Sequence, residues 1–229
     1  GHRQQRVARV GGESRFVGRR HRRGRAHRSR QDVDFRIGPL EREALERLPS
    51  YDEELKAELG LAWTEGDVVV GLQGDFCSNQ MPWEVLSEQG VSYRPVDALD
   101  SDDPEGALIG ALSDKTRLLA ISTVHFATGY RFDLKRLSDA CRRNDILLSV
   151  DVIQSLGAVN FDLSETPADF VTSGGHKWLL SPEGLGFMYC RPELRDQLRL
   201  RQFGWAMRES PYAFESESWE PARSARRFE

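Results

Sequence analysis

An acid, an amide and a lysine stand at intervals in the second half of the chain that suit cofactor chemistry. Asp151 ends the apolar run "ILLSVD", Gln154 follows three residues later, and Lys177 follows Asp151 by 26 residues. A buried carboxylate needs a charged or hydrogen-bonded partner, and a desolvated lysine loses its charge more readily and becomes a nucleophile. Pyridoxal phosphate (PLP) uses this set, because it binds a lysine as a Schiff base while an acid partners its pyridine nitrogen. The three residues therefore favour a PLP site.

Each of these residues also has a purely structural explanation. A lone Asp at a strand end often caps a helix or forms a buried ion pair, and a lysine on a turn is usually a solvated surface residue. The Gly174–Gly175 pair before Lys177 and the presence of both Asp151 and Gln154 argue against a plain surface turn. The cofactor interpretation therefore depends on the whole set.

Strands and helices alternate along the chain and position these residues. Residues 38–60 are predicted to be helical, with a break at Pro49 and a capping box over Ser50 to Glu53. Apolar runs predict strands at 67–73, 91–96, 117–123, 146–151, 168–173 and 185–190, and apolar periodicity predicts helices at 83–90, 102–113, 133–145 and 192–201. The alternation predicts an α/β fold with a mostly parallel sheet and helices on both faces. Ligands of such sheets bind beyond the carboxyl ends of the strands, where Phe76 to Asn79, Thr123 to His125, Asp151 to Gln154 and Ser173 to Lys177 are expected.

The stretch "SVDVIQSLG…ADFVTSGGHKWLLSPEGLGFMY" resembles the PLP-dependent class V aminotransferases, a family that includes cysteine desulfurases and isopenicillin N epimerase-like enzymes. The resemblance covers about residues 60–229 and is carried by the Asp-x-x-Gln motif, the interval to the lysine and the His-Lys-Trp triplet. It implies the large domain of the fold type I architecture, an amino-acid substrate and a homodimer with its active site near the subunit interface.

The resemblance also implies roles for single residues. Lys177 would form the Schiff base and carry the α-proton of the substrate, and Asp151 would pair with the pyridine nitrogen. Gln154 would lie near the phenolic oxygen of the ring, and His176 would stand beside the phosphate. A lone His is more often a satisfied structural residue, so this alternative stays open for His176.

Four further positions follow from the same comparison. Phe76 would stack on the cofactor ring and Thr123 would offer a polar contact, although Phe76 could be plain core and Thr123 could cap a turn. Family members often carry a phosphate-binding hydroxyl three residues before the lysine, where this chain has Gly174, so Ser173 is the candidate instead. The phosphate-binding turn upstream is expected at Ser50, although the residues before it do not resemble the strand that normally precedes that turn.

The composition divides the 229 residues into three parts. Residues 1–35 are basic and expected to be disordered, residues 36–205 form the PLP-binding large domain, and residues 206–229 form a surface segment. The family motif that begins at "RRFE" normally continues into a small domain that holds the substrate carboxylate, so the chain is expected to be a fragment. A truncated, catalytically inactive remnant is therefore the main alternative to an active enzyme.

The charge is unevenly distributed. Residues 1–30 hold eleven Arg, no Lys and one acid, a net charge of +10, so residues 31–229 carry −14 of the total of −4. An arginine-rich segment without lysine is typical of a shifted reading frame in GC-rich DNA, which we favour over a basic nucleic-acid-binding arm or an inert tail. The acidic remainder argues against nucleic-acid binding.

The remaining composition limits the compartment and the cofactors. No apolar run approaches the roughly 18 residues that a membrane helix needs. The three cysteines, Cys77, Cys141 and Cys190, are widely spaced and form no CxxC pair or Cys/His cluster, so no metal site is expected. Sparse, unpaired cysteines are typical of a reducing cytoplasm.

Overall fold

A computed structural model describes residues 45–48, 58–201, 203–215 and 218–228, with the backbone alone for residues 45–48. The chain divides into residues 1–32 and residues 33–229, and every described residue lies in the second unit. The predictions made for residues 1–35 and for the capping box at Ser50 therefore fall outside the described residues.

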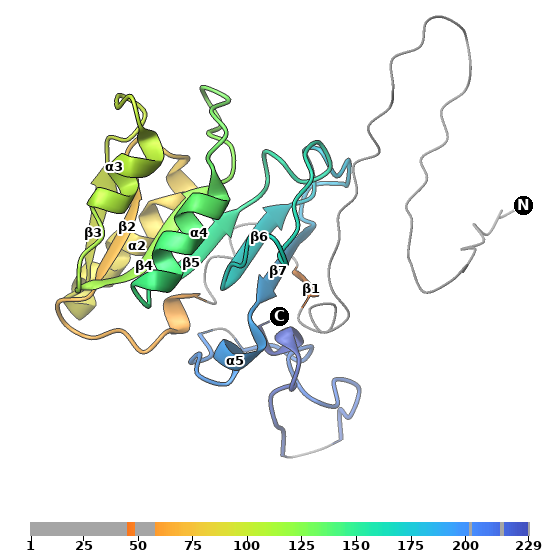
Figure 1. The fold of residues 1–229 in the computed structure, drawn as a ribbon. Helices are drawn as coiled ribbons and strands as arrows, with labels where there is room; N and C mark the ends of the chain where they lie inside the picture. The colour runs from red at the N-terminus through yellow and green to blue at the C-terminus, as the bar shows by residue number, and fades with distance from the viewer. Residues whose placement is uncertain (1–44, 49–57, 202, 216–217, 229) are drawn as a thin grey trace, which may run out of the picture. The chain divides into compact units, whose positions relative to one another are not determined.

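A single twisted sheet organises the described part of the chain (Figure 1). Its order is β1-β7-β6-β5-β4-β2-β3, and β2, β3, β4, β5 and β6 are parallel whereas β7 is antiparallel to both of its neighbours. The mostly parallel α/β sheet expected from the sequence is thereby confirmed. The strands are β1 (Leu45–Leu48), β2 (Val68–Leu72), β3 (Ser92–Val96), β4 (Thr116–Ser122), β5 (Leu147–Asp151), β6 (Phe170–Gly174) and β7 (Gly186–Cys190).

Helices cover both faces of the sheet, as predicted. Successive strand residues point to opposite faces, so Val70 packs in one core cluster with Leu108 and Leu137, whereas Val69 packs in another with Trp83. The helices α3 (Pro104–Gly110) and α4 (Leu134–Arg143) lie side by side on the first face (Figure 1). The second face is covered by α2 (Met81–Glu84), η4 (Val85–Gln89) and α5 (Pro192–Arg195).

Local signals explain where these helices begin and end. Asp103 and Asp133 are the N-caps of α3 and α4, and their side chains accept hydrogen bonds from Gly106 N and Arg136 N at 3.0 and 3.1 Å. Pro104 occupies the first turn of α3, where its missing N–H costs no hydrogen bond. At the end of η4, Gly90 adopts the left-handed conformation (φ 76°) that stops a helix.

Two predictions for secondary structure are corrected. Residues 45–48 lie within the predicted 38–60 helix but form a strand that pairs antiparallel with β7. The open edge of β7 supplies backbone partners that outweigh the helical pattern of this short segment. The predicted helix over 192–201 ends at Arg195.

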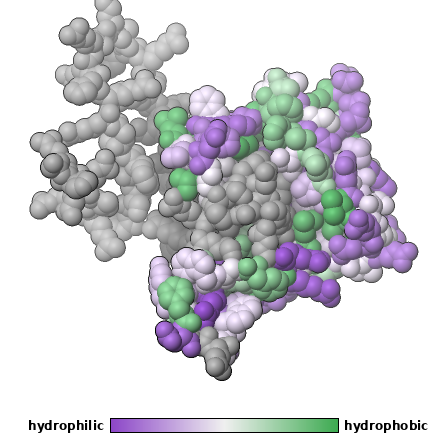
Figure 2. Space-filling model, turned by 180° about the vertical axis from the view of Figure 1, so that it is seen from behind, coloured by the Kyte–Doolittle hydropathy of each residue, from purple (hydrophilic) through white to green (hydrophobic). Residues whose placement is uncertain are grey.

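Large hydrophobic side chains remain exposed at several places. The aromatic ones near the end of the described chain are Phe203, Trp205, Tyr212, Phe214 and Trp219, and their rings contact one another. Figure 2 shows, on one face, separate hydrophobic patches between hydrophilic ones. Among the described residues, no helix is long and apolar enough to cross a membrane.

Candidate functional site

Five parallel strands end on one edge of the sheet, which we call the carboxyl edge, and four of them lead into the predicted site segments. The last residues of β2, β4, β5 and β6 are Leu72, Ser122, Asp151 and Gly174. Because these strands run in the same direction, the segments that follow them meet at this edge. All seven predicted site residues within the described chain lie in these segments or at these strand ends.

Asp151 is buried at the tip of β5. Its Oδ1 accepts a hydrogen bond from Ile153 N at 2.9 Å, and its Oδ2 accepts one from Asn79 Nδ2 at 2.9 Å. Donors to a carboxylate stabilise the charged form and offset the cost of burial. The side chain is therefore held as an oriented acceptor at the carboxyl edge.

Thr123 is buried beside Asp151. Its backbone N–H donates to the Asp151 carbonyl at 2.8 Å, and its hydroxyl lies 3.3 Å from the same oxygen and 2.6 Å from Ser155 Oγ. Thr123 thus connects the ends of β4 and β5, and its hydroxyl is engaged with protein atoms.

Lys177 and Phe76 face each other across the carboxyl edge. Lys177 Nζ lies 6.0 Å from the centroid of the Phe76 ring, at the outer limit of a cation–π contact. The Phe76 ring is 42% exposed and packs edge-on against Phe126, with centroids 5.5 Å apart. The structure therefore brings together an amine and an accessible aromatic face from segments about 100 residues apart.

The remaining predicted residues surround Lys177 less closely. Ser173 is buried in β6 and its hydroxyl donates to the Gly174 carbonyl at 3.0 Å. His176 is exposed and its ring lies against Gly174, where an added Cβ would come within 3.1 Å of Nδ1. Gln154 is half-buried in the turn after β5. Their contacts with a phosphate or a cofactor ring stay predictions.

Three further polar residues border Asp151 and had no role predicted from the sequence: Asp75, Asn79 and Ser122. The Ser122 hydroxyl donates to both carboxylate oxygens of Asp75 at 3.1 Å, and Phe76 N donates to Asp75 Oδ1 at 2.7 Å. Burial raises the pKa of Asp75, and the negative charge of Asp151 raises it further. Asn79 lies within a predicted strand-end segment, which was the only signal that could have found it.

His125, also in such a segment, fastens two loops together. Its Nε2 lies 3.0 Å from the Gly74 carbonyl, which only accepts, so Nε2 carries the proton. Nδ1 is then the acceptor for the Thr128 hydroxyl at 2.9 Å. This neutral tautomer holds the turn before Phe76 against the loop after β4.

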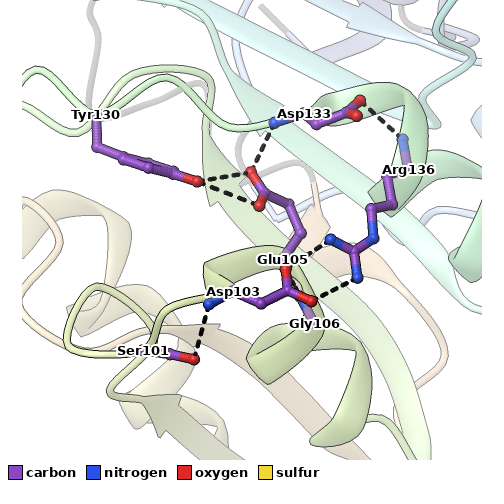
Figure 3. A network of polar contacts seen from close by, with 7 residues as sticks. All are labelled: Ser101, Asp103, Glu105, Gly106, Tyr130, Asp133 and Arg136. Atoms are coloured by element: carbon purple, nitrogen blue, oxygen red, sulfur yellow. Dashed lines mark hydrogen bonds and ion pairs between the residues drawn. The ribbon is translucent and has the colours of Figure 1, made fainter.

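Glu105 anchors the far end of that loop (Figure 3). The Tyr130 hydroxyl donates to both Glu105 oxygens at 3.2 and 3.3 Å, and Asp133 N donates to Oε1 at 2.8 Å. A neighbouring ion pair between Arg136 and Asp103 is exposed. The buried Glu105 therefore fixes the loop that begins with Thr123 and His125.

The arrangement fits a flat cofactor that carries a ring nitrogen. Asp151 is an oriented carboxylate acceptor at one strand tip, Lys177 brings an amine from the next strand, and Phe76 offers a ring face. A lysine for the Schiff base and an acid for the pyridine nitrogen are the groups that PLP requires of a protein. The residues present thus match the group that the sequence analysis expected.

Curated proteins of known family match this chain over part of its length. The probable cysteine desulfurase of Methanothermobacter thermautotrophicus is 34% identical over 147 residues, which are 63% of this chain and 36% of that protein. The isopenicillin N epimerase of Amycolatopsis lactamdurans is 34% identical over 149 residues, 62% of this chain and 37% of the relative. The matched region thus spans about a third of the length of these relatives.

Solved structures share the fold. A C-DES mutant with glycine covalently linked to its PLP cofactor superposes with a TM-score of 0.73 at 23% identity, covering 82% of this chain and 50% of that one. The apo cysteine desulfurase of Thermococcus onnurineus gives 0.71 at 22% identity, covering 82% and 47%. The family model described as aminotransferase class V matches residues 55–229. The chain therefore belongs to the class V aminotransferase family.

Proposed function

We propose that this chain is the cofactor-binding part of a PLP-dependent enzyme that acts on an amino acid. The observation that carries the proposal is the placement of Asp151, Lys177 and Phe76 at one edge of the sheet. Family membership and the PLP-linked glycine named for the C-DES mutant support the choice of cofactor and substrate class.

Each residue contributes a distinct action. Bound PLP supplies an electron sink that stabilises negative charge at the substrate α-carbon. Lys177 binds the cofactor and moves the α-proton with its Nζ, Asp151 accepts from the protonated pyridine nitrogen, and Phe76 covers one face of the ring. Gln154, His176, Thr123 and Ser173 are proposed as polar contacts around them.

The reaction type is left open between transamination, desulfuration, elimination and epimerisation, because all four begin by removing the α-proton. The relatives' names include desulfurases and epimerases. The described thiols of Cys141 and Cys190 are buried, so neither is proposed as a nucleophile toward the substrate.

The proposal also covers the oligomeric state of the protein and its cellular compartment. Trp178 and Leu180, beside Lys177, are 55% and 87% exposed, and a second copy of the protein is proposed to cover them as a homodimer. The three free cysteines support a reducing, cytoplasmic location.

Borohydride trapping tests the proposal directly. The purified protein is mixed with PLP, reduced with borohydride and digested, and mass spectrometry locates the attached cofactor. We expect attachment at Lys177, loss of attachment in Lys177→Ala, and no change in Lys135→Ala, whose exposed amine pairs with Asp139 on α4. Attachment spread over surface lysines in the wild type would contradict the proposal.

A panel of amino acids then separates an enzyme from an inactive remnant. The absorbance of bound PLP is followed after each addition, together with exchange of the α-hydrogen for solvent deuterium. Deuterium exchange that requires Lys177 supports catalysis. Bound PLP with no exchange for any amino acid would favour the remnant.

A further inference from the structure

A continuous chain of hydrogen bonds joins Asp151 to the turn that carries Phe76. Asn79 Nδ2 lies 2.9 Å from Asp151 Oδ2 and 3.0 Å from Ser122 Oγ, and the Ser122 hydroxyl continues to Asp75. Asp75 in turn accepts from Phe76 N at 2.7 Å. The members come from three segments of the chain: the turn after β2, the end of β4 and the end of β5.

The sheet register explains why these groups meet. Ser122 and Asp151 are directly paired across β4 and β5, so their side chains project from the same face of the sheet. The one-turn helix η3 (Cys77–Asn79) lies over this pair and places the amide of Asn79 between them. Asn79 is only 8% exposed, and its two partners, Ser122 and Asp151, are 3% and 6% exposed.

The direction of each bond follows from the chemistry of the groups. An ionised carboxylate only accepts, so the amide must present Nδ2 and not its oxygen to Asp151. The Ser122 hydroxyl donates its one proton to Asp75 and therefore accepts from Asn79. Rotating the amide by half a turn would place two oxygens against each other, so the orientation of Asn79 is fixed.

The amide lies among several acidic groups. Asp75 and Asp151 repel each other, and the negative charge of Asp151 also acts on the buried carboxyl of Glu58, whose pKa it raises. Asn79 donates directly to Asp151 and reaches Asp75 only through Ser122, and a donor to a carboxylate favours its charged form.

From this geometry we infer that Asn79 is a positioning residue, which holds Asp151 oriented and ionised for the ring nitrogen of PLP and ties it through Ser122 and Asp75 to the turn of Phe76. The inference rests on the proposed function for its connection to PLP. The hydrogen-bond chain itself is a property of the protein without cofactor.

The decisive measurement is the pKa of Asp151 in the PLP-free protein, by carbon-13 NMR of labelled aspartate carboxyls assigned with Asp151→Asn. Removing a donor from a carboxylate raises its pKa, so Asn79→Ala is expected to raise the pKa of Asp151 by about one unit. Ser122→Ala is expected to raise the pKa of Asp75 while moving Asp151 less. Asn144→Ala is the matched control. The Asn144 amide also donates one hydrogen bond, to the Ala140 carbonyl at 2.8 Å, but it lies away from the site.

The second measurement is the dissociation constant of PLP by equilibrium dialysis. Loss of a hydrogen bond to a charged group predicts about tenfold weaker binding for Asn79→Ala, and unchanged binding for Asn144→Ala. If Asn79→Ala does not fold, Asn79→Ser is used instead, because serine keeps one donor in a smaller side chain. The pKa of Asp151 must then shift more in Asn79→Ser than in the control Asn144→Ala. An unchanged pKa of Asp151 and unchanged PLP binding would overturn the inference.

The two proposals fail separately. If the wild type binds no PLP but Asn79→Ala raises the pKa of Asp151, the proposed function fails and the positioning of Asp151 stands. If PLP attaches at Lys177 and Asn79→Ala changes neither quantity, the positioning role fails and the proposed function stands.

Discussion

The Ser149 hydroxyl donates a hydrogen bond to Oε1 of Glu58, whose carboxyl is fully buried against β5. Ser149 and Asp151 are alternate residues of that strand, so Glu58 lies on the same face of the sheet as Asp151. Its Oε2 is buried and has no hydrogen-bond partner among the residues that the structure describes. An ionised carboxylate is costly in this position, and Glu58 is therefore a protonated acid over much of the neutral pH range.

This burial predicts that the protein loses stability as the pH rises. Desolvation raises the pKa of Glu58 to about 8, the Ser149 hydrogen bond opposes the shift and the charge of Asp151 adds to it. Because the folded pKa is raised, this stabilisation is present in full below the unfolded value of 4.5, falls progressively as the pH rises from 4.5 to about 8, and is gone above about 8. The change is on the order of 5 kcal/mol.

Thermal unfolding between pH 5 and pH 9 measures this effect. The wild type is expected to melt at lower temperature as the pH rises, and Glu58→Gln is expected to remove most of that slope. Glu88→Gln, at an exposed position, is the control and should keep the slope. A wild-type slope retained by Glu58→Gln would show that other groups, such as Asp75 or Asp169, are responsible.

The Glu105 anchor predicts a different kind of loss. Glu105→Ala removes the acceptor for Tyr130 and leaves Asp133 N without its partner. Breaking these bonds is expected to reduce the free energy of unfolding by about 2–3 kcal/mol. Glu105→Gln keeps one oxygen acceptor and should lose less.

Urea unfolding at neutral pH compares the variants. Asp103→Asn is the matched control, because Asp103 pairs with Arg136 in the same network (Figure 3). That ion pair is exposed, and exposed ion pairs contribute little. Equal losses for Glu105→Ala and Asp103→Asn would contradict the proposed anchor.

The cysteines predict selective labelling. Cys77 is exposed, whereas Cys141 and Cys190 are buried, and burial raises the pKa of each buried thiol to about 12. Because the thiolate is the reactive form, the folded protein should react with one equivalent of a disulfide reagent and the unfolded protein with three. Cys77→Ser should abolish the fast reaction, and intact mass would reveal any second label on the folded chain.

The sequence predicted the parts of the fold and site that depend on local patterns. All six predicted strands from residue 67 onward occur, because each is a short apolar run between turn residues. The strand-end rule then placed Asp151, Thr123, Phe76 and Lys177 at one edge. Parallel topology brings such positions together whatever the side chains between them are.

Other features depend on distant contacts and had no local signal. β1 contradicts its helical pattern because it pairs with β7, which lies about 140 residues later. Asn79 and Asp151 are 72 residues apart, and their bond depends on the register of β4 and β5 and on the turn that forms η3. The burial of Glu58 against Ser149 also depends on a distant contact, because the two residues are 91 positions apart in the sequence.

Because β7 is antiparallel to β6, it determines on which side of the sheet the following residues begin. β7 carries the backbone from the Lys177 loop to the opposite rim of the sheet, so Pro192 starts on the side remote from Asp151. For a residue after Cys190 to lie at the carboxyl edge of its own sheet, the backbone must run back along the strands, roughly 17 Å for five extended residues.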